Sequence, residues 1–402
     1  MNRKIEKISE SQLFILFFLA VISAFGPIVT DLYLPAMPSM NKAFHTSTSM
    51  VQLSLTVSFL GLGIGQLLFG PVSDKYGRKK PLLVSLVLFI LSSIGCINAW
   101  DIHSFNFFRL VQGFAGAGGI VIAKSVAVDL YRGELLTKFL SMLAAVQGMA
   151  PIIAPLAGGA LLKFTDWQGI FIVLLFLGGG IFLLALLHRE TLKPEKRLQG
   201  SILHTFSYFL PVLQNRDFMF YTLALSFTMG TFFSYLSASP FIFQEVYHLS
   251  PLMYSVCFAI NAFGFIVGSQ LVRKFRHSQN AAKTGVIGLF ASAAVQAVLL
   301  NTNAPVIAVE SMFFCMTVFM GHVMPSTTAL ALNLERKAAG NASAVIGFSQ
   351  FLCGSLVSPL VGLGNVTRST SIAIFCCSVM CMFFVFKALK RNIRMIDESR
   401  KS

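Results

Sequence analysis

The fold is decided by the stretch Gly70-Pro71-Val72-Ser73-Asp74-Lys75-Tyr76-Gly77-Arg78-Lys79-Lys80, which separates two long apolar segments. Apolar residues fill the chain from about residue 50 to 69 and again from about 81 to 99. The stretch between them predicts a loop of about ten residues with four basic side chains, and short basic loops between spanning helices stay in the cytoplasm. We expect Gly70 and Gly77 to supply the turns of this loop, and Asp74 to pair locally or to cap a helix.

The composition predicts an all-α integral membrane protein. The chain has 402 residues, of which 55% are hydrophobic and 12% charged, with a mean hydropathy of +0.74. A soluble domain carries about 25% charge, and a helix needs about 20 apolar residues to cross a bilayer. Continuous apolar runs, rather than short alternating segments, indicate helices as the spanning element. Twelve transmembrane helices are predicted at about 13–37, 50–70, 81–99, 104–127, 138–162, 168–187, 218–241, 252–272, 283–301, 305–330, 341–363 and 369–389.

The net charge of +15 reflects membrane topology and argues against a nucleic-acid partner. With the amino terminus inside, 26 of the 31 Lys and Arg residues fall in predicted cytoplasmic segments. Three (Lys42, Lys163 and Arg368) fall in external loops, and two (Arg109 and Lys124) fall within spans. This asymmetry predicts that both termini are cytoplasmic and that basic loops contact lipid headgroups.

The longest polar interruption divides the chain into two halves. We predict an N-terminal six-helix bundle at 1–187, a cytoplasmic linker at 188–217, and a C-terminal six-helix bundle with a short basic tail at 218–402. Within the linker, the mildly apolar residues 202–213 are expected to lie on the membrane surface. The seven cysteines all fall in predicted spans without a metal or disulfide pattern, and no phosphate-binding loop or nucleophile constellation indicates an enzyme.

Two charged residues within the first-half spans are candidates for proton coupling. Asp31 is the only acid there that must lie in the hydrocarbon, where a charge costs on the order of 3 kcal/mol. Helical rise puts Asp31 about 9 Å and Arg109 about 7 Å below the outer boundary. A buried arginine needs an anion, so we expect Arg109 to meet Asp31 and to tune its proton affinity. The alternatives are an acid wetted from outside and an arginine that reaches the outer surface.

Further polar residues within the spans are candidates for a substrate cavity, and one pair is expected at the cytoplasmic side. Glu310 and His322 could join proton transfer or contact substrate; the alternatives are an outer-interface acid and a packed, hydrogen-bonded histidine. At the cytoplasmic end of the fourth span, Asp129 is expected to pair with Arg78, or to form an exposed pair of little energetic weight. The cavity candidates are Tyr33, Gln112, Gln147, Tyr235, Asn261, Glu310 and His322.

The spacing Gly-x-x-x-Asp-x-x-Gly-Arg-Lys resembles the loop signature of the major facilitator superfamily, which lies between the second and third helices. It stands here as Gly70, Asp74, Gly77 and Arg78, followed by Lys79. The resemblance implies a twelve-helix fold of two six-helix bundles and a transport cycle in which the halves rock. It also implies that the signature residues, together with Asp129, form a cytoplasmic gate.

The fifth predicted span carries two prolines and two glycines that resemble the antiporter motif of drug exporters, Gly-x-x-x-Gly-Pro-x-x-Gly-Gly. Pro155, Gly158 and Gly159 match that pattern, alanines at 150 and 154 replace the two earlier glycines, and Pro151 stands at its first variable position. The alternative is a proline-kinked membrane helix without a transport role. The resemblance favours export over import.

Several segments together resemble the Bcr/CflA subfamily of drug:proton antiporters: Thr30 to Pro38, Phe232 to Phe241, and Asn261 to Phe265 with Gly268-Ser269. The resemblance covers nearly the whole chain. It implies a monomer in the bacterial inner membrane that exports drugs such as chloramphenicol or bicyclomycin, with the proton gradient as energy source and no cofactor or metal. The rival hypothesis is a transporter of the same fold for a physiological metabolite such as a sugar, amino acid or siderophore.

Overall fold

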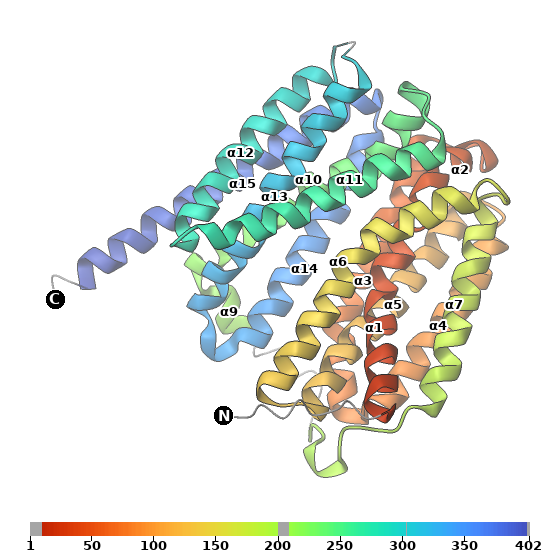
Figure 1. Ribbon diagram of the computed structural model, residues 1–402, viewed down its shortest axis with the longest axis vertical. Coiled ribbons are helices and arrows are strands. Elements are labelled where there is room, and N and C mark those ends of the chain that lie inside the picture. Colours follow the sequence, from red (N-terminus) through yellow and green to blue (C-terminus); the bar gives the residue numbers. More distant parts are fainter. Residues whose placement is uncertain (1–9, 200–208, 303, 400–402) are drawn as a thin grey trace.

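The computed structural model describes residues 10–199, 209–302 and 304–399, which form helices and no strand (Figure 1). The helices fall into two groups, each of which packs mainly within itself. The first group contains α1 (Glu10–Asp31), α3 (Thr48–Tyr76), α4 (Lys79–Ile97), α5 (Ile102–Leu130), α6 (Gly133–Leu161) and α7 (Trp167–Leu187), with the short η1 (Leu34–Ala36) and α2 (Met37–Ala43) after α1 and η2 (Pro194–Lys196) after α7.

The second helix group follows the linker. It contains α9 (Leu210–Gln214), α10 (Arg216–Phe241), η3 (Ile242–Val246), α11 (Pro251–Leu271), η4 (Val272–Lys274), α12 (Ser278–Leu299), α13 (Val306–Leu334), η5 (Arg336–Ala338), α14 (Ala339–Val357), η6 (Ser358–Gly362) and α15 (Val366–Ser399). The predicted surface segment at 202–213 lies largely outside the described residues, and only α9 at its end is seen.

The predicted all-helical membrane fold is confirmed. Twelve helices in the described ranges have 19 or more residues, and each covers one predicted span. Nine of the helices are long and apolar enough to cross a membrane, ten if the bent pair Phe18–Gly26 and Ile28–Ala43 is one span. Helix α10 is more polar and does not meet this criterion. Its buried Thr228 and Ser234 donate to backbone carbonyls four residues earlier, so their hydroxyls are satisfied within the helix.

The signature stretch is more helical than predicted. Instead of a loop of about ten residues, α3 continues through Gly70 and Pro71 to Tyr76, and α4 begins at Lys79. The prediction of a turn at Gly70 is therefore wrong, because the polar residues after it extend the last turns of α3 beyond the apolar span. Gly77 alone makes the predicted turn. Its φ of +90° would strain any other residue, and it ends α3.

The two helix groups are joined at one end of the bundle. We call this end, which holds α2, the α2 end, and we call the opposite end, with Gly77 and residues 188–199, the linker end (Figure 1). Three hydrogen bonds link the groups at the α2 end, each from a side chain to a backbone carbonyl. They run from Ser49 to Pro359 (3.1 Å), from Gln52 to Ser237 (3.0 Å), and from Gln244 to Pro35 (3.0 Å). Helices α6 and α11 also pack together there.

Candidate functional site

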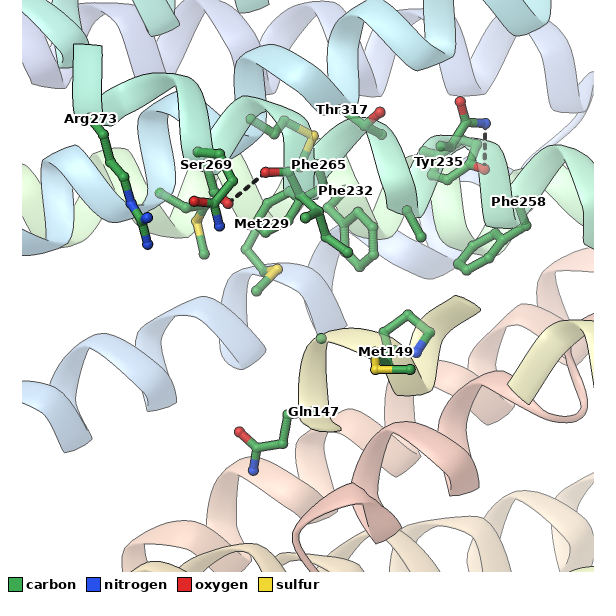
Figure 2. A pocket seen from close by; sticks show the side chains of 18 residues that line it. Gln147, Met149, Met229, Phe232, Tyr235, Phe258, Phe265, Ser269, Arg273 and Thr317 are labelled. Atoms are coloured by element: carbon green, nitrogen blue, oxygen red, sulfur yellow. Dashed lines mark hydrogen bonds between the residues drawn. The ribbon is translucent and has the colours of Figure 1, made fainter. Parts of the chain in front are cut away.

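A cavity of about 780 Å³ lies between the two helix groups, with α6 on one side and α10, α11 and α13 on the other (Figure 2). Its walls are mostly aromatic and thioether side chains, including Met149, Met229, Phe232, Phe258 and Phe265. A cavity of this size and apolar character suits a drug-sized amphipathic molecule.

Three of the predicted cavity residues lie in its wall: Gln147 from α6, Tyr235 from α10 and Asn261 from α11. In Figure 2 the Gln147 side chain points away from the helices that carry the other two, and its amide donates to the carbonyl of Ser23 at 3.2 Å. Together with Ser269, Gln270, Arg273 and Thr317, these three residues provide the polar groups of a largely apolar pocket, and such groups orient a ligand.

Glu310 stands one layer behind this wall. The Asn261 side-chain amide donates to the Tyr235 hydroxyl at 2.9 Å and to Glu310 Oε2 at 3.1 Å. The other carboxylate oxygen, Glu310 Oε1, and the Asn261 carbonyl oxygen are buried without a hydrogen-bond partner. Glu310 is thus connected to the cavity through Asn261.

Asp31 ends α1 at the α2 end and is buried, with 6% of its surface exposed. The Thr30 hydroxyl donates to its carboxylate at 2.9 Å. The next residue, Leu32, packs against Gly158 of α6, and the adjacent Gly159 packs against Ser255 of α11. The acid therefore lies where the two helix groups meet.

Arg109 is completely buried in α5, but it does not pair with Asp31 as predicted. Its Nη1 donates to the Gln112 side chain (2.5 Å) and to the Val29 carbonyl (3.3 Å), and its guanidinium lies 4.2 Å from the centre of the Tyr33 ring. Nearby neutral acceptors and an aromatic face take the place of the carboxylate. Nε and Nη2 have no hydrogen-bond partner.

Two predicted cavity residues, Tyr33 and Gln112, lie around Arg109 instead. Tyr33 bonds the Ser54 hydroxyl at 3.0 Å, and Gln112 donates to Ser93 at 2.8 Å. Both surround Arg109 inside the first helix group and do not contribute to the cavity wall. The Arg-x-x-Gln spacing could have predicted the contact between Arg109 and Gln112, because residues three apart share a helix face.

His322 is also away from the cavity wall. Its Nδ1 lies 3.1 Å from the Val318 carbonyl of the same helix, and its ring lies 6.0 Å from each of the Phe275 and Phe319 rings. The alternative interpretation, a packed and hydrogen-bonded histidine, describes its surroundings.

The prolines and glycines of the exporter-like motif lie in α6, which continues through both Pro151 and Pro155. Pro151 lines the cavity. A Cβ atom added to Gly158 would overlap the Leu32 carbonyl oxygen, and one added to Gly159 would overlap the Ser255 hydroxyl of α11. These two glycines let α6 approach the end of α1 on one side and α11 on the other, next to Asp31.

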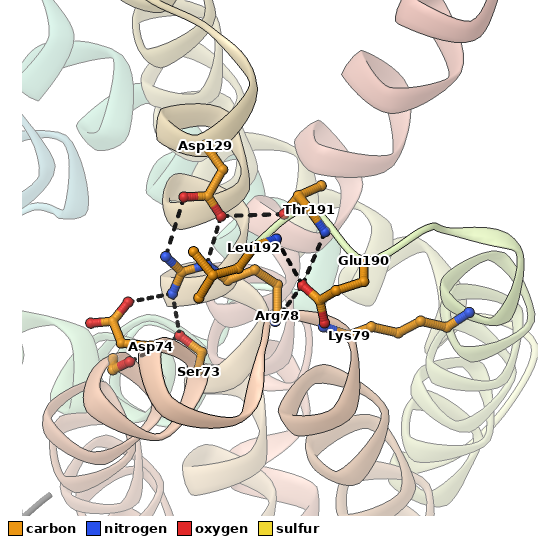
Figure 3. Close-up of polar contacts among 9 residues, drawn as sticks. Ser73, Asp74, Arg78, Lys79, Asp129, Glu190, Thr191 and Leu192 are labelled. Carbon is orange, nitrogen blue, oxygen red and sulfur yellow. Dashed lines mark hydrogen bonds and ion pairs between the residues drawn. The ribbon is translucent and has the colours of Figure 1, made fainter. Parts of the chain in front are cut away.

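At the linker end, Arg78 forms the predicted pair with Asp129 and the local pair with Asp74 (Figure 3). Its Nε lies 2.8 Å from Asp129, and its Nη1 lies 2.5 Å from Asp74 and 2.8 Å from the Ser73 hydroxyl. The Asp129 side chain is 14% exposed and that of Asp74 is 53% exposed, so solvent weakens the second pair.

Sequence reasoning missed a third acid in this cluster. The Glu190 carboxylate accepts from the backbone N–H groups of Arg78 (2.8 Å), Lys79 (3.1 Å), Thr191 (3.0 Å) and Leu192 (3.0 Å) (Figure 3). Burial favours its neutral form, but these hydrogen bonds outweigh burial and hold the pKa of Glu190 below its usual value. Glu190 thereby fastens the start of the linker to the signature turn.

Comparisons with known proteins agree with this architecture. The family model described as Major Facilitator Superfamily matches residues 13–359. The chain is 38% identical over 364 residues to the Bacillus subtilis protein named uncharacterized MFS-type transporter YdgK, covering 89% of this chain and 90% of that one. It is 27% identical over 382 residues to a Haemophilus influenzae bicyclomycin resistance protein homolog, covering 94% and 96%.

Two further comparisons extend the picture. The chain is 31% identical over 237 residues to a chloramphenicol resistance protein of Pseudomonas aeruginosa, covering 59% of this chain and 56% of that one. A solved bacterial homolog of the lysosomal transporter Spinster, described as inward-facing and unoccupied, has a TM-score of 0.73 at 15% identity and covers 94% of this chain and 96% of its own. That likeness concerns the fold alone.

Proposed function

We infer, from the premise that this chain belongs to the major facilitator superfamily, that it exports small amphipathic drugs in exchange for protons. The chain is a multi-pass membrane transporter and not an enzyme. Relatives named for bicyclomycin and chloramphenicol resistance support drug export, in agreement with the resemblance to the Bcr/CflA subfamily. We propose that it acts as a monomer in the bacterial inner membrane.

The observation that carries the proposal is the wall of the cavity. Apolar side chains, many of them aromatic or thioether groups, form most of it. Its polar residues are Gln147, Tyr235, Asn261, Ser269, Gln270, Arg273 and Thr317. A sugar or amino acid needs many hydrogen-bonding groups to replace its hydration, whereas an amphipathic drug needs apolar area and a few polar contacts. The wall therefore favours drugs over the metabolite rival.

Alternating access follows from where the helix groups are joined. Hydrogen bonds hold them together at the α2 end, and the cavity extends toward Arg273 at the linker end of α11. In our proposal the linker end is cytoplasmic, so this arrangement takes up drug from inside. Rocking of the groups would then open the α2 end and release the drug outside.

Asp31 is our candidate for the coupling acid. It is buried at the junction of α1, α6 and α11, the place that must open when the groups rock. A proton gained there from outside removes a charge that is costly to bury, and its loss to the inside restores that charge. Arg109 is the candidate that sets the proton affinity of Asp31, because it has unmet hydrogen-bonding capacity in the same helix group.

The linker-end cluster has a different proposed role. Arg78, Asp74, Asp129 and Glu190 all belong to the first helix group or to the linker that follows it. In our proposal they hold the ends of α3, α4 and α5 as one rigid unit on the cytoplasmic side, which the second group meets when the inner gate closes.

The test is drug-driven proton movement in proteoliposomes, with a panel that includes chloramphenicol and with Asp31→Asn beside the unaltered protein. We expect the unaltered protein to exchange protons for drug, and Asp31→Asn to bind drug without moving protons. Glu195→Gln, at an exposed acid of the linker, is the matched control and should exchange normally. Normal exchange by Asp31→Asn would show that the coupling site lies elsewhere. If no drug of the panel moves protons in the unaltered protein, the hypothesis of a metabolite transporter would be favoured instead.

A further inference from the structure

Three helices of the second group bring Tyr235, Asn261 and Glu310 together. Tyr235 and Asn261 line the cavity at the end away from Arg273, and Glu310 lies behind Asn261 (Figure 2). Asn261 is fully buried and Tyr235 nearly so. The Asn261 amide donates its hydrogens to Tyr235 and Glu310, and its carbonyl oxygen is left free to accept a hydrogen bond.

Two buried acceptors in this group lack donors: Asn261 Oδ1 and Glu310 Oε1. A buried carboxylate oxygen without a donor is costly, so a complementary group stabilises it strongly. No Lys, Arg or His in the described ranges forms an ion pair with Glu310.

The groups that surround Glu310 offer no positive charge. The hydrogen bond that Glu310 accepts comes from the Asn261 amide, which is uncharged. Asn261 Oδ1 and Glu310 Oε1 therefore remain available as acceptors beside the cavity wall.

We propose that Glu310 and Asn261 form a subsite for the protonated nitrogen of a cationic amphiphile, so that the exporter selects aromatic amines as well as neutral drugs. The inference rests on the proposed function and assigns a substrate class to its cavity. An ammonium group provides several N–H donors and one positive charge, which match the two free acceptors and the carboxylate.

The rest of the cavity fits the body of such a molecule. Phe232, Phe258 and Phe265 line the wall between the subsite and the mouth. Aromatic faces hold apolar rings and also attract cations. The basic residue of the lining, Arg273, is exposed at the opposite end, where it does not repel a cation at the subsite.

The test measures binding of monodansylcadaverine, a fluorescent aromatic amine, to the full chain in lipid nanodiscs at pH 7, with empty nanodiscs as the blank. The matched probe is its N-acetyl derivative, which keeps the aromatic body and loses the charge. We expect the amine to bind at least about tenfold more tightly than the acetylated probe, the effect of a charged hydrogen bond. Glu310→Gln should abolish this preference and leave binding of the acetylated probe unchanged.

Glu195→Gln, at an exposed acid of the linker outside the cavity, is the control, and it should keep the preference for the amine. Asn261→Ala, which retains the carboxylate, should weaken amine binding at least about threefold and provides a second test if Glu310→Gln does not fold. Equal binding of the two probes by the unaltered protein, or an undiminished preference in both variants, would overturn the proposal. This binding measurement involves no gradient and no transport. Its result therefore does not depend on whether protons are exchanged through Asp31.

Discussion

Arg78 and Arg109 are both buried, yet they are satisfied in opposite ways. Arg78, at the linker end, bonds two carboxylates and a hydroxyl. Arg109, inside α5, bonds an amide and a backbone carbonyl, lies on a tyrosine ring, and keeps two nitrogens without a partner. Arg78 is 6% exposed and Arg109 is 0% exposed, so the better-satisfied arginine is also the one nearer to water.

The difference indicates that Arg78 has a structural role, whereas Arg109 has hydrogen-bond donors that are still free to bind an anion. Arg78 has its anions in place, and a completed cluster of this kind holds helix ends together. Arg109 is held by neutral groups, so an anion that reaches it in another conformation would gain a strong interaction. We propose that Asp31 is that anion, and substitutions in both regions test the contrast.

The largest effect is expected from Arg109→Gln. The amide can still bond Gln112, but the charge that sets the proton affinity of Asp31 is lost. Drug-driven proton exchange should fall on the order of 100-fold, the size expected when a buried charge loses its partner. Proteoliposome assays with Arg109→Lys alongside provide the comparison, since lysine restores the charge. Exchange at the unaltered rate in Arg109→Gln would remove Arg109 from the coupling machinery.

Gly158→Ala probes the packing beside Asp31 without changing a charge. The added methyl overlaps the Leu32 carbonyl oxygen, so α6 must move away from the end of α1. We expect a loss of roughly 1–3 kcal/mol in the free energy of unfolding, measured by thermal denaturation in detergent. Gly148→Ala, in the same helix with open space around it, should be neutral. Equal effects of the two substitutions would contradict the close approach of α1 and α6.

The two carboxylates that pair with Arg78 should contribute unequally to the free energy of unfolding. Asp129→Asn removes the better-shielded partner and should destabilise the protein by about 1–2 kcal/mol, whereas Asp74→Asn should cost less than about 1 kcal/mol because its side chain is half exposed. A double-mutant cycle with Arg78→Gln measures each coupling energy. A larger coupling to Asp74 than to Asp129 would reverse our assignment of the main pair.

A similarly small effect, less than about 1 kcal/mol, is expected from Glu190→Gln, because the amide oxygen still accepts some of the backbone hydrogen bonds. Its pH dependence has a defined sign. The pKa of Glu190 is lower in the folded protein, so its contribution is present above the ordinary carboxyl pKa and is lost as pH falls through the folded value. The stability difference between Glu190→Gln and the unaltered protein should therefore shrink on acidification. A difference that stays constant down to low pH would exclude an ionised Glu190.

The helices were predictable because a bilayer demands about 20 apolar residues per span, and this requirement marks each span on the chain. The predicted Asp31–Arg109 pair was wrong for a physical reason. Depth along a helix follows from counting residues, but the direction of a side chain around the helix does not, and Gln112 and the Tyr33 ring were nearer. Glu190 escaped notice because its partners are backbone N–H groups, which every sequence has.

The hydrogen bonds that join the helix groups at the α2 end all reach backbone carbonyls, those of Pro35, Ser237 and Pro359. Each contributes about 1 kcal/mol, so the three together shift the balance between open and closed forms by only about 100-fold. A single proton or drug molecule is enough to reverse a bias of that size. Because the acceptors belong to the main chain, the residues that carry them can diverge, whereas Ser49, Gln52 and Gln244 must keep their side chains for these three bonds to form.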